Sequence, residues 1–288
     1  MNVRIGTSAF TAAGWEGVFY PAGMKPADYL SYYAEHFDTV EVDSTFYRTP
    51  AASTVRKWYQ ATPEGFVFSA KAPQAITHEK QLEGCEEEFA RFAETMQQGL
   101  GEKLGVLLLQ LPYFNKKAFA TAEPFLARLE KFLDGRPKGR FAVEVRNKAW
   151  LGPRLLGILG ARGVALACLD HPWMPRPLEL LEKCDPVTAD FAYIRLLGDR
   201  YGIEEQTKTW DKVIVERRRE IGEWKTFMTR VKRGGEEFLV YVNNHYAGHA
   251  PATARQLMEA LGTKAWSGAM RSASGGTERL RFGRMEVE

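Results

Sequence analysis

The sequence lacks the features that mark several large classes of protein. Only three of its 288 residues are cysteines (Cys85, Cys168 and Cys184), and no two form a CxxC pair. This spacing argues against a disulfide scaffold or a zinc knuckle and is typical of a reducing cytoplasm. No apolar run approaches the roughly 18 residues of a membrane span. Met1 is followed by a strand-like segment and not by a charged leader with an apolar core. We therefore expect a cytoplasmic protein that does not cross a membrane.

Charge of one sign and glycine-rich motifs are also scarce. The 39 Lys and Arg residues nearly balance the 36 Asp and Glu residues, so the net charge of +3 identifies no partner. Residues 207–235 hold nine basic residues against four acidic ones, a pattern typical of a solvated helix face. No GxGxxG or GxxxxGK[ST] motif follows the first strand-like segment, which disfavours a doubly wound nucleotide-binding sheet.

What the sequence does contain is a regular alternation of strand and helix patterns. Eight short runs rich in Val, Ile, Leu, Phe and Ala recur at a mean spacing of about 33 residues, close to one strand-plus-helix unit. The predicted strands are 3–8, 39–45, 66–72, 105–111, 141–146, 164–170, 191–198 and 237–244. Most intervals carry helical periodicity, such as Trp224, Phe227, Met228 and Val231. The Pro-rich interval 171–190 holds only a short helix candidate near residues 178–182.

Eight such units without a change of composition predict an α/β fold, a single TIM (β/α)8 barrel with an outer ring of helices. We expect this domain to span residues 1–266, with its last helix ending near Leu261 and Gly262. Residues 267–288 are then a tail rich in Gly, Ser and Arg.

The barrel also predicts where function resides. Catalytic groups in this fold come from the C-terminal ends of strands and the loops that follow them. Because side chains alternate along a strand, the valines of 39–45 turn Glu41 and Asp43 inward, and the apolar residues of 141–146 do the same for Glu144 and Arg146. Alternation and strand ends add Lys71, Gln110, Asp170, Arg195 and Asn243. The alternative to a site is a structural ion network, which pairs Glu41 with Lys71 and Glu144 with Arg146.

Histidines and aromatic residues gather in the same loops. Four of the five histidines follow predicted strands: His78, His171, His245 and His249. So do many aromatic residues, among them Tyr47, Tyr113, Trp173 and Tyr201. Flat aromatic faces in a polar cleft suit sugar rings or nucleobases, although loop packing explains any single residue. The segments 198–202 and 243–248, which include Asn244, carry the glycines and the arginine that a phosphate site uses.

The ordered motifs resemble those of the YecE-like family, domain of unknown function 72, over about residues 3–262. The matching segments are Gly6-Thr7-Ser8, Phe19-Tyr20-Pro21, Val40-Glu41-Val42-Asp43-Ser44-Thr45-Phe46-Tyr47, Lys71-Ala72-Pro73, Leu109-Gln110-Leu111-Pro112, Val143-Glu144-Val145-Arg146, Tyr193-Ile194-Arg195 and Asn243-Asn244. The resemblance implies a TIM barrel in a cytoplasmic bacterial or archaeal-type protein, related to sugar isomerases and without an established reaction.

Three positions depart from the family pattern. Asp43 stands where the family commonly has Asn, Leu197 where it has His, and His245 where it has Asp. All three lie at the predicted site, so the substrate and mechanism implied by the resemblance do not transfer directly.

The leading hypothesis is an enzyme that acts on a carbohydrate or a phosphorylated sugar. Glu41 and Glu144 would face each other across the mouth as general acid and base. Lys71 would tune Glu41 or hold an oxygen, while Arg146 and Arg195 would clamp an anion. The other predicted substrate-binding residues are Asp43, His78, Gln110, Asp170, Asn243, Asn244 and His249.

Two alternatives stay open. The first is a metal-dependent nuclease or phosphodiesterase, in which a divalent metal activates water and residues 207–235 track a nucleic acid. The cations at the rim would repel such a metal. The second is a non-catalytic protein that binds a small molecule in the same pocket. The sequence requires no cofactor, and it fixes neither the metal ligands, nor the choice between isomerisation and hydrolysis, nor the oligomeric state.

Overall fold

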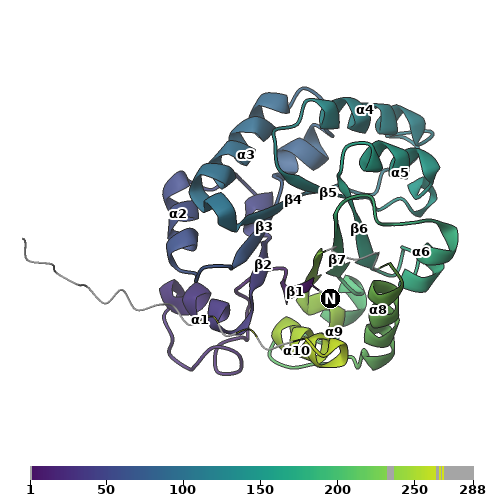
Figure 1. Ribbon diagram of the computed structural model, residues 1–288. Helices are drawn as coiled ribbons and strands as arrows, with labels where there is room; N and C mark the ends of the chain where they lie inside the picture. The colour runs from purple at the N-terminus through teal and green to yellow at the C-terminus, as the bar shows by residue number, and fades with distance from the viewer. Residues whose placement is uncertain (1, 232–236, 264–265, 267, 269–288) are drawn as a thin grey trace, which may run out of the picture.

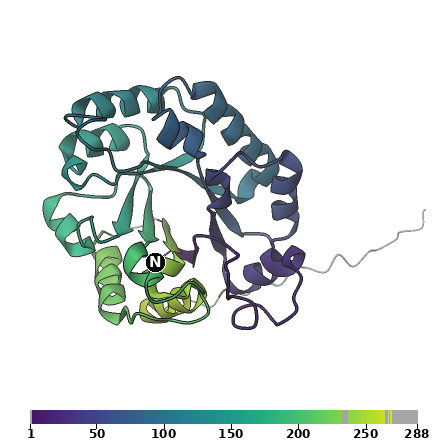
Figure 2. The same ribbon diagram turned by 180° about the vertical axis from the view of Figure 1, so that it is seen from behind.

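The computed structural model describes residues 2–231, 237–263, 266 and 268. These residues form parallel strands inside a ring of helices (Figures 1 and 2). The strands are β1 (Asn2–Thr7), β2 (Thr39–Val42), β3 (Val67–Lys71), β4 (Leu104–Gln110), β5 (Arg140–Glu144), β6 (Ala165–Asp170), β7 (Phe191–Leu196) and β8 (Glu237–Val242). The helices are α1 (Tyr29–His36), α2 (Ala52–Gln60), α3 (Glu86–Leu100), α4 (Glu123–Asp134), α5 (Pro153–Gly160), α6 (Pro177–Lys183), α7 (Arg200–Glu204), α8 (Arg218–Val231), α9 (Asn244–Ala247) and α10 (Ala250–Leu261). The predicted TIM barrel is confirmed.

All eight predicted strands are present, but several end earlier than predicted. β2 stops at Val42 because Asp43 has helical backbone angles and leads into a 3-10 turn. β5 stops at Glu144, two residues before the predicted end. The alternation of polar and apolar residues therefore continues past the ladder, and Asp43 and Arg146 belong to the loops at the barrel mouth.

The strand order is β1-β8-β7-β6-β5-β4-β3-β2, which leaves β1 and β2 at the seam of the barrel. Gly6 lies so close to β2 that an added Cβ would stand 2.0 Å from the carbonyl oxygen of Thr39. The hydroxyl of Tyr33 bridges the seam, since it accepts from the N–H of Thr7 at 2.9 Å and donates to the Thr39 carbonyl at 3.1 Å. The barrel is nearly closed, and glycine is required at this approach.

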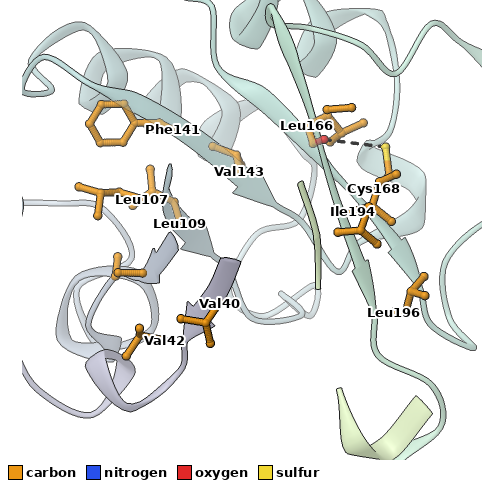
Figure 3. Close-up of a cluster of buried hydrophobic side chains, with 14 of the residues drawn as sticks. Val40, Val42, Leu107, Leu109, Phe141, Val143, Leu166, Cys168, Ile194 and Leu196 are labelled. Carbon is orange, nitrogen blue, oxygen red and sulfur yellow. Dashed lines mark hydrogen bonds between the residues drawn. The ribbon is translucent and has the colours of Figure 1, made fainter. Parts of the chain in front are cut away.

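Two hydrophobic cores lie on opposite faces of the strands. The outer core packs strand side chains against the helices, and Figure 3 shows part of it: Val40, Val42, Leu107, Leu109, Phe141, Val143, Leu166, Cys168, Ile194 and Leu196. The inner core fills the barrel and includes Val106, Leu108, Ala142, Tyr193 and Tyr241. Glu41 and Glu144 alternate with outer-core residues, so the structure confirms that they face inward.

Much of the basic segment 207–235 belongs to helix α8. Trp224, Phe227, Met228 and Val231 are its buried stripe, as predicted. Arginines of the same region form ion pairs with neighbouring glutamates: Arg217 with Glu220, Arg218 with Glu216, and Arg219 with Glu223. This is the solvated, ion-paired face that the charge pattern predicts.

The end of the barrel also follows the sequence. Helix α10 ends at Leu261, and Gly262 caps it with a φ of 63°. Trp266 donates its indole N–H to the carbonyl of Ala34 at 2.7 Å, which ties this point of the chain to α1. Apart from Gly268, the predicted tail lies outside the described residues. No helix in the described part of the chain is long and apolar enough to cross a membrane.

Candidate active site

A buried ionic cluster centred on Arg195 closes the C-terminal end of the barrel. The Nε and one terminal nitrogen of Arg195 donate to one oxygen of Glu41, at 3.0 and 2.6 Å, and the other terminal nitrogen donates to Glu144 at 2.6 Å. The Tyr193 hydroxyl donates to the second oxygen of Glu41, and the Nε of Arg146 to the second oxygen of Glu144, both at 2.6 Å. Every oxygen of the two buried carboxylates therefore has a partner.

This arrangement differs from the predicted acid/base pair. Glu41 and Glu144 do not face each other across an open mouth: both side chains are fully buried and Arg195 lies between them. The predicted pairing of Glu41 with Lys71 is wrong, while that of Glu144 with Arg146 is confirmed. Arg195 is long enough to reach both carboxylates, and pairing offsets the cost of burying them. Its guanidinium is therefore occupied and is a poorer anion clamp than predicted.

The pKa values of the two carboxyl groups are shifted in opposite directions. Burial raises the pKa of Glu41, and Arg195 only partly opposes this. Burial also acts to raise the pKa of Glu144, but the charges of Arg146 and Arg195 outweigh it and lower that pKa to about 2. Such a split is typical of an acid/base pair. The complete burial of Glu41 and Glu144 is not typical of such a pair, because a substrate needs to reach the reacting groups.

Above this cluster lies a cavity of about 400 Å³, which we call the central pocket. It opens at the C-terminal end of the strands, where the fold predicts a site. Its lining residues are Asp43, Phe46, Tyr47, Lys71, Gln110, Arg146, His171, Trp173, Arg195, Leu197, Gly198, Arg200, Tyr201, Asn243 and His245. Both Glu41 and Glu144 lie beneath this lining.

Lys71 is the one lysine among the described residues that line the central pocket, and it is nearly buried. The residue is 8% exposed, and its Nζ lies 3.3 Å from the Oδ1 of Asp43 and 3.9 Å from the ring centre of Phe46. Burial lowers the pKa of the Lys71 ammonium; the charge of Asp43 opposes this shift and that of Arg195 adds to it. A buried amine whose pKa is lowered is suited to accept a proton.

Other predicted site residues take up different positions around the mouth. Gln110 lines the central pocket and donates to the carbonyl of Leu111 at 2.8 Å. Asn243 also lines it, and its side-chain oxygen caps α9 by accepting from the N–H of His245. Asp170 lies instead in a neighbouring cavity of about 310 Å³, where it forms an ion pair with Arg176 at 2.5 Å.

Three further predicted residues, besides Glu41, Glu144 and Asp170, do not line the central pocket. The side-chain oxygen of Asn244 accepts from the indole of Trp15 at 3.2 Å and from the first N–H of α10 at 2.9 Å. His249 is buried with its Nδ1 2.7 Å from a backbone carbonyl. His78 makes a 2.8 Å hydrogen bond with Thr77, and burial lowers its pKa to about 4. Asn244 and His249 hold the loops around α10 in place.

The predicted site omitted several residues that the structure places in the pocket. His171 and His245 line it, and burial, aided by the charge of Arg146, lowers the pKa of His171 to about 4. Tyr47, Trp173 and Tyr201 form its rim and are 74%, 58% and 71% exposed. The sequence signal was present, because all five follow predicted strands. Composition could not say which of the many loop aromatics converge on one cavity.

The described residues include no group of three or more His, Cys, Asp or Glu side chains placed to hold a metal ion. Asp43, the acidic residue in the lining of the central pocket, is instead paired with Lys71. The chemistry of the pocket therefore has to be argued from these side chains themselves.

Comparisons with known proteins agree with this architecture. YunF of Bacillus subtilis is 26% identical over 271 residues, which cover 86% of this chain and 92% of YunF. YecE of Escherichia coli K12 is 34% identical over 119 residues, 41% of each chain. The crystal structure of a DUF72 family protein from Thermotoga maritima covers 91% of this chain and all of that chain, with a TM-score of 0.71 and 27% identity.

More distant structures share the fold alone. A D-tagatose 3-epimerase-like protein superimposes with a TM-score of 0.50 at 11% identity, over 91% of this chain and 98% of that one. The family model described as "Protein of unknown function DUF72" matches residues 4–274, nearly the whole length. The resemblance seen in the sequence motifs is therefore confirmed: this chain belongs to the DUF72 family.

Proposed function

We propose that the central pocket is the active site of an enzyme that acts on a carbohydrate bearing an anionic group such as phosphate, and that the reaction includes a proton transfer through Lys71. The observation that carries this proposal is the Lys71–Asp43 pair, a nearly buried amine beside a carboxylate on the wall of a cavity of about 400 Å³. A pocket of this size accommodates a small ligand.

The charge of the lining favours an anion. Lys71, Arg146 and Arg200 line the pocket beside one carboxylate of the lining, that of Asp43. Arg195 is neutralised from below by two glutamates, and Arg200 forms an ion pair through its Nε with Glu204, outside the lining. Arg146 is anchored through its Nε to Glu144, and this fixes its direction. A fixed arginine beside a lysine is a common way to bind phosphate or carboxylate.

The surroundings of Lys71 favour proton transfer. With its pKa lowered by burial, a larger share of the Lys71 side chain is the neutral amine near pH 7 than for an exposed lysine. A neutral amine can remove a proton from a carbon next to a carbonyl group, and the Asp43 carboxylate then stabilises the ammonium ion. The reaction class this supports is isomerisation or epimerisation of a sugar.

The aromatic rim favours a carbohydrate. Tyr47, Trp173 and Tyr201 expose large apolar faces around one polar cavity. Exposed aromatic side chains gathered at one place mark a binding surface. Sugars pair hydroxyl groups with apolar ring faces, so they suit a polar pocket with aromatic walls.

The two alternatives are less well supported. A metal-dependent phosphodiesterase needs a ligand set that the described residues do not offer, and the basic face of α8 is occupied by ion pairs. A non-catalytic binding protein would have the same pocket, but it would gain nothing from a buried amine with a lowered pKa. Turnover separates this alternative from the proposal.

The test is solvent hydrogen exchange. The protein is incubated in D₂O with a panel of aldose and ketose phosphates, and the C–H signals next to the carbonyl are followed by NMR. We expect loss of one such signal for at least one sugar, with a rate that rises with pH as Lys71 deprotonates. The Lys71→Met variant should lower that rate roughly 10²–10⁴-fold.

The matched control is Lys138→Met, because Lys138 is an exposed lysine near the opposite end of the barrel. It should exchange at the rate of the natural protein. Exchange that survives in Lys71→Met would refute the role of Lys71. Binding of a sugar phosphate with no exchange, and no other turnover of that sugar, would identify a binding protein instead.

A further inference from the structure

A second cavity, of about 160 Å³, lies beside the central pocket where β1 and β8 end. We call it the side pocket. Trp15 and Trp210 contribute to its wall, together with Ser8 and the paired asparagines that follow β8. The site described above assigns it no role.

Two buried oxygen atoms at the side pocket make no hydrogen bond in the described structure. Ser8 is 3% exposed, yet its buried hydroxyl makes no hydrogen bond within the described structure. The Oδ1 of Asp43 is also buried and accepts no hydrogen bond, although the Lys71 ammonium lies 3.3 Å away. Nearly all buried polar groups in folded proteins are hydrogen-bonded, so the Ser8 hydroxyl, which has neither a hydrogen bond nor an ion pair in the described structure, indicates a missing partner.

The side pocket and the central pocket share a wall. Asp43, Asn243 and His245 line both cavities. The two cavities therefore adjoin at the Asp43 carboxylate, which is the group that pairs with Lys71.

The chemistry of the side pocket differs from that of the central pocket. No lysine or arginine lines it, and Asp43 is its acidic residue, so a second anionic group is disfavoured. A hydroxyl, a carboxylate and amides beside the half-buried indole ring of Trp210 suit a neutral ring with several hydroxyl groups, since each sugar hydroxyl both donates and accepts.

We infer that the side pocket is a second sugar subsite, and that the substrate is a glycoside or disaccharide whose anionic sugar occupies the central pocket and whose neutral sugar contacts Ser8. This inference rests on the proposed function for the identity of the anionic sugar. The unpaired hydroxyl of Ser8 and the wall shared through Asp43 carry the rest.

The test uses the indole N–H signals of the seven tryptophans in two-dimensional NMR. Trp210→Phe and Trp173→Phe assign one signal to each pocket. The probes are glucose 6-phosphate, trehalose 6-phosphate, sucrose 6-phosphate and the neutral disaccharides trehalose and sucrose. We expect all three phosphates to move the Trp173 signal, but only disaccharides to move that of Trp210. A disaccharide phosphate should bind roughly tenfold more tightly than glucose 6-phosphate, equivalent to about 1.4 kcal/mol.

Two variants of Ser8 sharpen the readout, which is the ratio of the two affinities. Ser8→Val fills the cavity and removes the hydroxyl, so the tenfold preference should vanish. Ser8→Ala removes the hydroxyl alone and should reduce the preference several-fold. A Trp210 signal that no disaccharide moves would overturn the inference, as would equal losses for both classes of phosphate in Ser8→Val.

The same experiment distinguishes failure of the second sugar subsite from failure of the proposed function. If glucose 6-phosphate moves Trp173 and no disaccharide moves Trp210, the active site stands and the side pocket holds water only. If neutral disaccharides move Trp210 while no phosphate moves Trp173, the sugar subsite stands and the anionic substrate is wrong. If no sugar moves either signal, both are wrong.

Discussion

The two ends of the barrel are closed by ionic clusters of opposite design. At the C-terminal end one guanidinium, that of Arg195, lies between the carboxylates of Glu41 and Glu144. At the N-terminal end one carboxylate, that of Glu237, lies between the guanidinium groups of Arg4 and Arg140, at 2.8 and 2.7 Å. Arg146 adds a second cation to the first cluster and Asp38 a second anion to the second, so each cluster balances two positive charges with two negative ones.

The clusters differ more in their surroundings than in their bonds. The side chains of Arg195, Glu41 and Glu144 are at most 3% exposed, whereas Arg4 and Arg140 are 24% and 36% exposed. Water therefore solvates the N-terminal cluster but not the C-terminal one, above which lies the central pocket. The N-terminal cluster shows that an end of the barrel can be closed with partly exposed charges. The complete burial of the C-terminal cluster is therefore the unusual feature. Buried charges with perturbed pKa values are typical of functional sites.

The largest effect is expected from Arg195→Met. This change leaves two fully buried carboxylates without their shared cation, and breaking a buried pair in this way costs about 3–5 kcal/mol. The free energy of unfolding, measured by urea denaturation at pH 7, should fall by that amount. The loss should shrink at low pH, where a carboxylate can be protonated.

Arg140→Met is the matched change at the other end. Glu237 keeps Arg4 as a partner, and the lost pair is partly solvated, so the cost should be about 1 kcal/mol or less. Equal losses from the two variants would show that burial does not distinguish the clusters.

A second effect, about 3 kcal/mol, is expected from pH. Burial, only partly opposed by Arg4, raises the pKa of Asp38, which pairs with Arg4 at the N-terminal end, from an ordinary 3.8 to about 6. The folded state therefore binds the Asp38 proton more tightly than the unfolded state does. Its contribution to stability is present below pH 4 and is lost as the pH rises to 6. Asp38→Asn should abolish this loss and stabilise the protein by about 3 kcal/mol at pH 7.

Glu144 in the C-terminal cluster should show the opposite sign. Because the pKa of Glu144 is lowered to about 2 by Arg146 and Arg195 against the effect of burial, its contribution is full above pH 4.5 and is lost as the pH falls toward 2. Urea denaturation from pH 3 to 7 measures both. An Asp38→Asn variant with an unchanged pH profile would contradict the assignment at the N-terminal end.

The sequence predicted the barrel and most of its inward-facing charges, because both follow from short-range periodicity. Alternation with apolar neighbours is a local property, and it placed Glu41 and Glu144 correctly. It could not predict that Arg195 reaches both carboxylates, since that contact joins residues more than 50 positions apart and depends on side-chain length across the barrel. For the same reason the sequence did not predict that Lys71 pairs with Asp43 and not with Glu41.

The site was predicted less completely than the fold. Strand ends identified the end of the barrel where the central pocket opens, but loop conformation decides which side chains line a cavity. Asn244 and His249 cap and brace α10, while Trp173 and Tyr201, which are in similar loops, reach the rim. The side pocket depends on an unpaired hydroxyl at Ser8, and no sequence pattern reports a missing hydrogen bond.

The smallest effect on stability, and the clearest separation of folding from binding, is expected from Tyr201→Ala. The side chain is 71% exposed at the rim of the central pocket, so its removal should change the free energy of unfolding by less than about 0.5 kcal/mol. If the rim holds a sugar ring, the same change should weaken binding of a sugar phosphate several-fold in a calorimetric titration. Tyr113→Ala is the control, because Tyr113 is 60% exposed and does not line the central pocket. Equal binding losses from both variants, or none from Tyr201→Ala, would show that the aromatic rim is ordinary surface. The contrast between the two ends of the barrel would then rest on the buried charges alone.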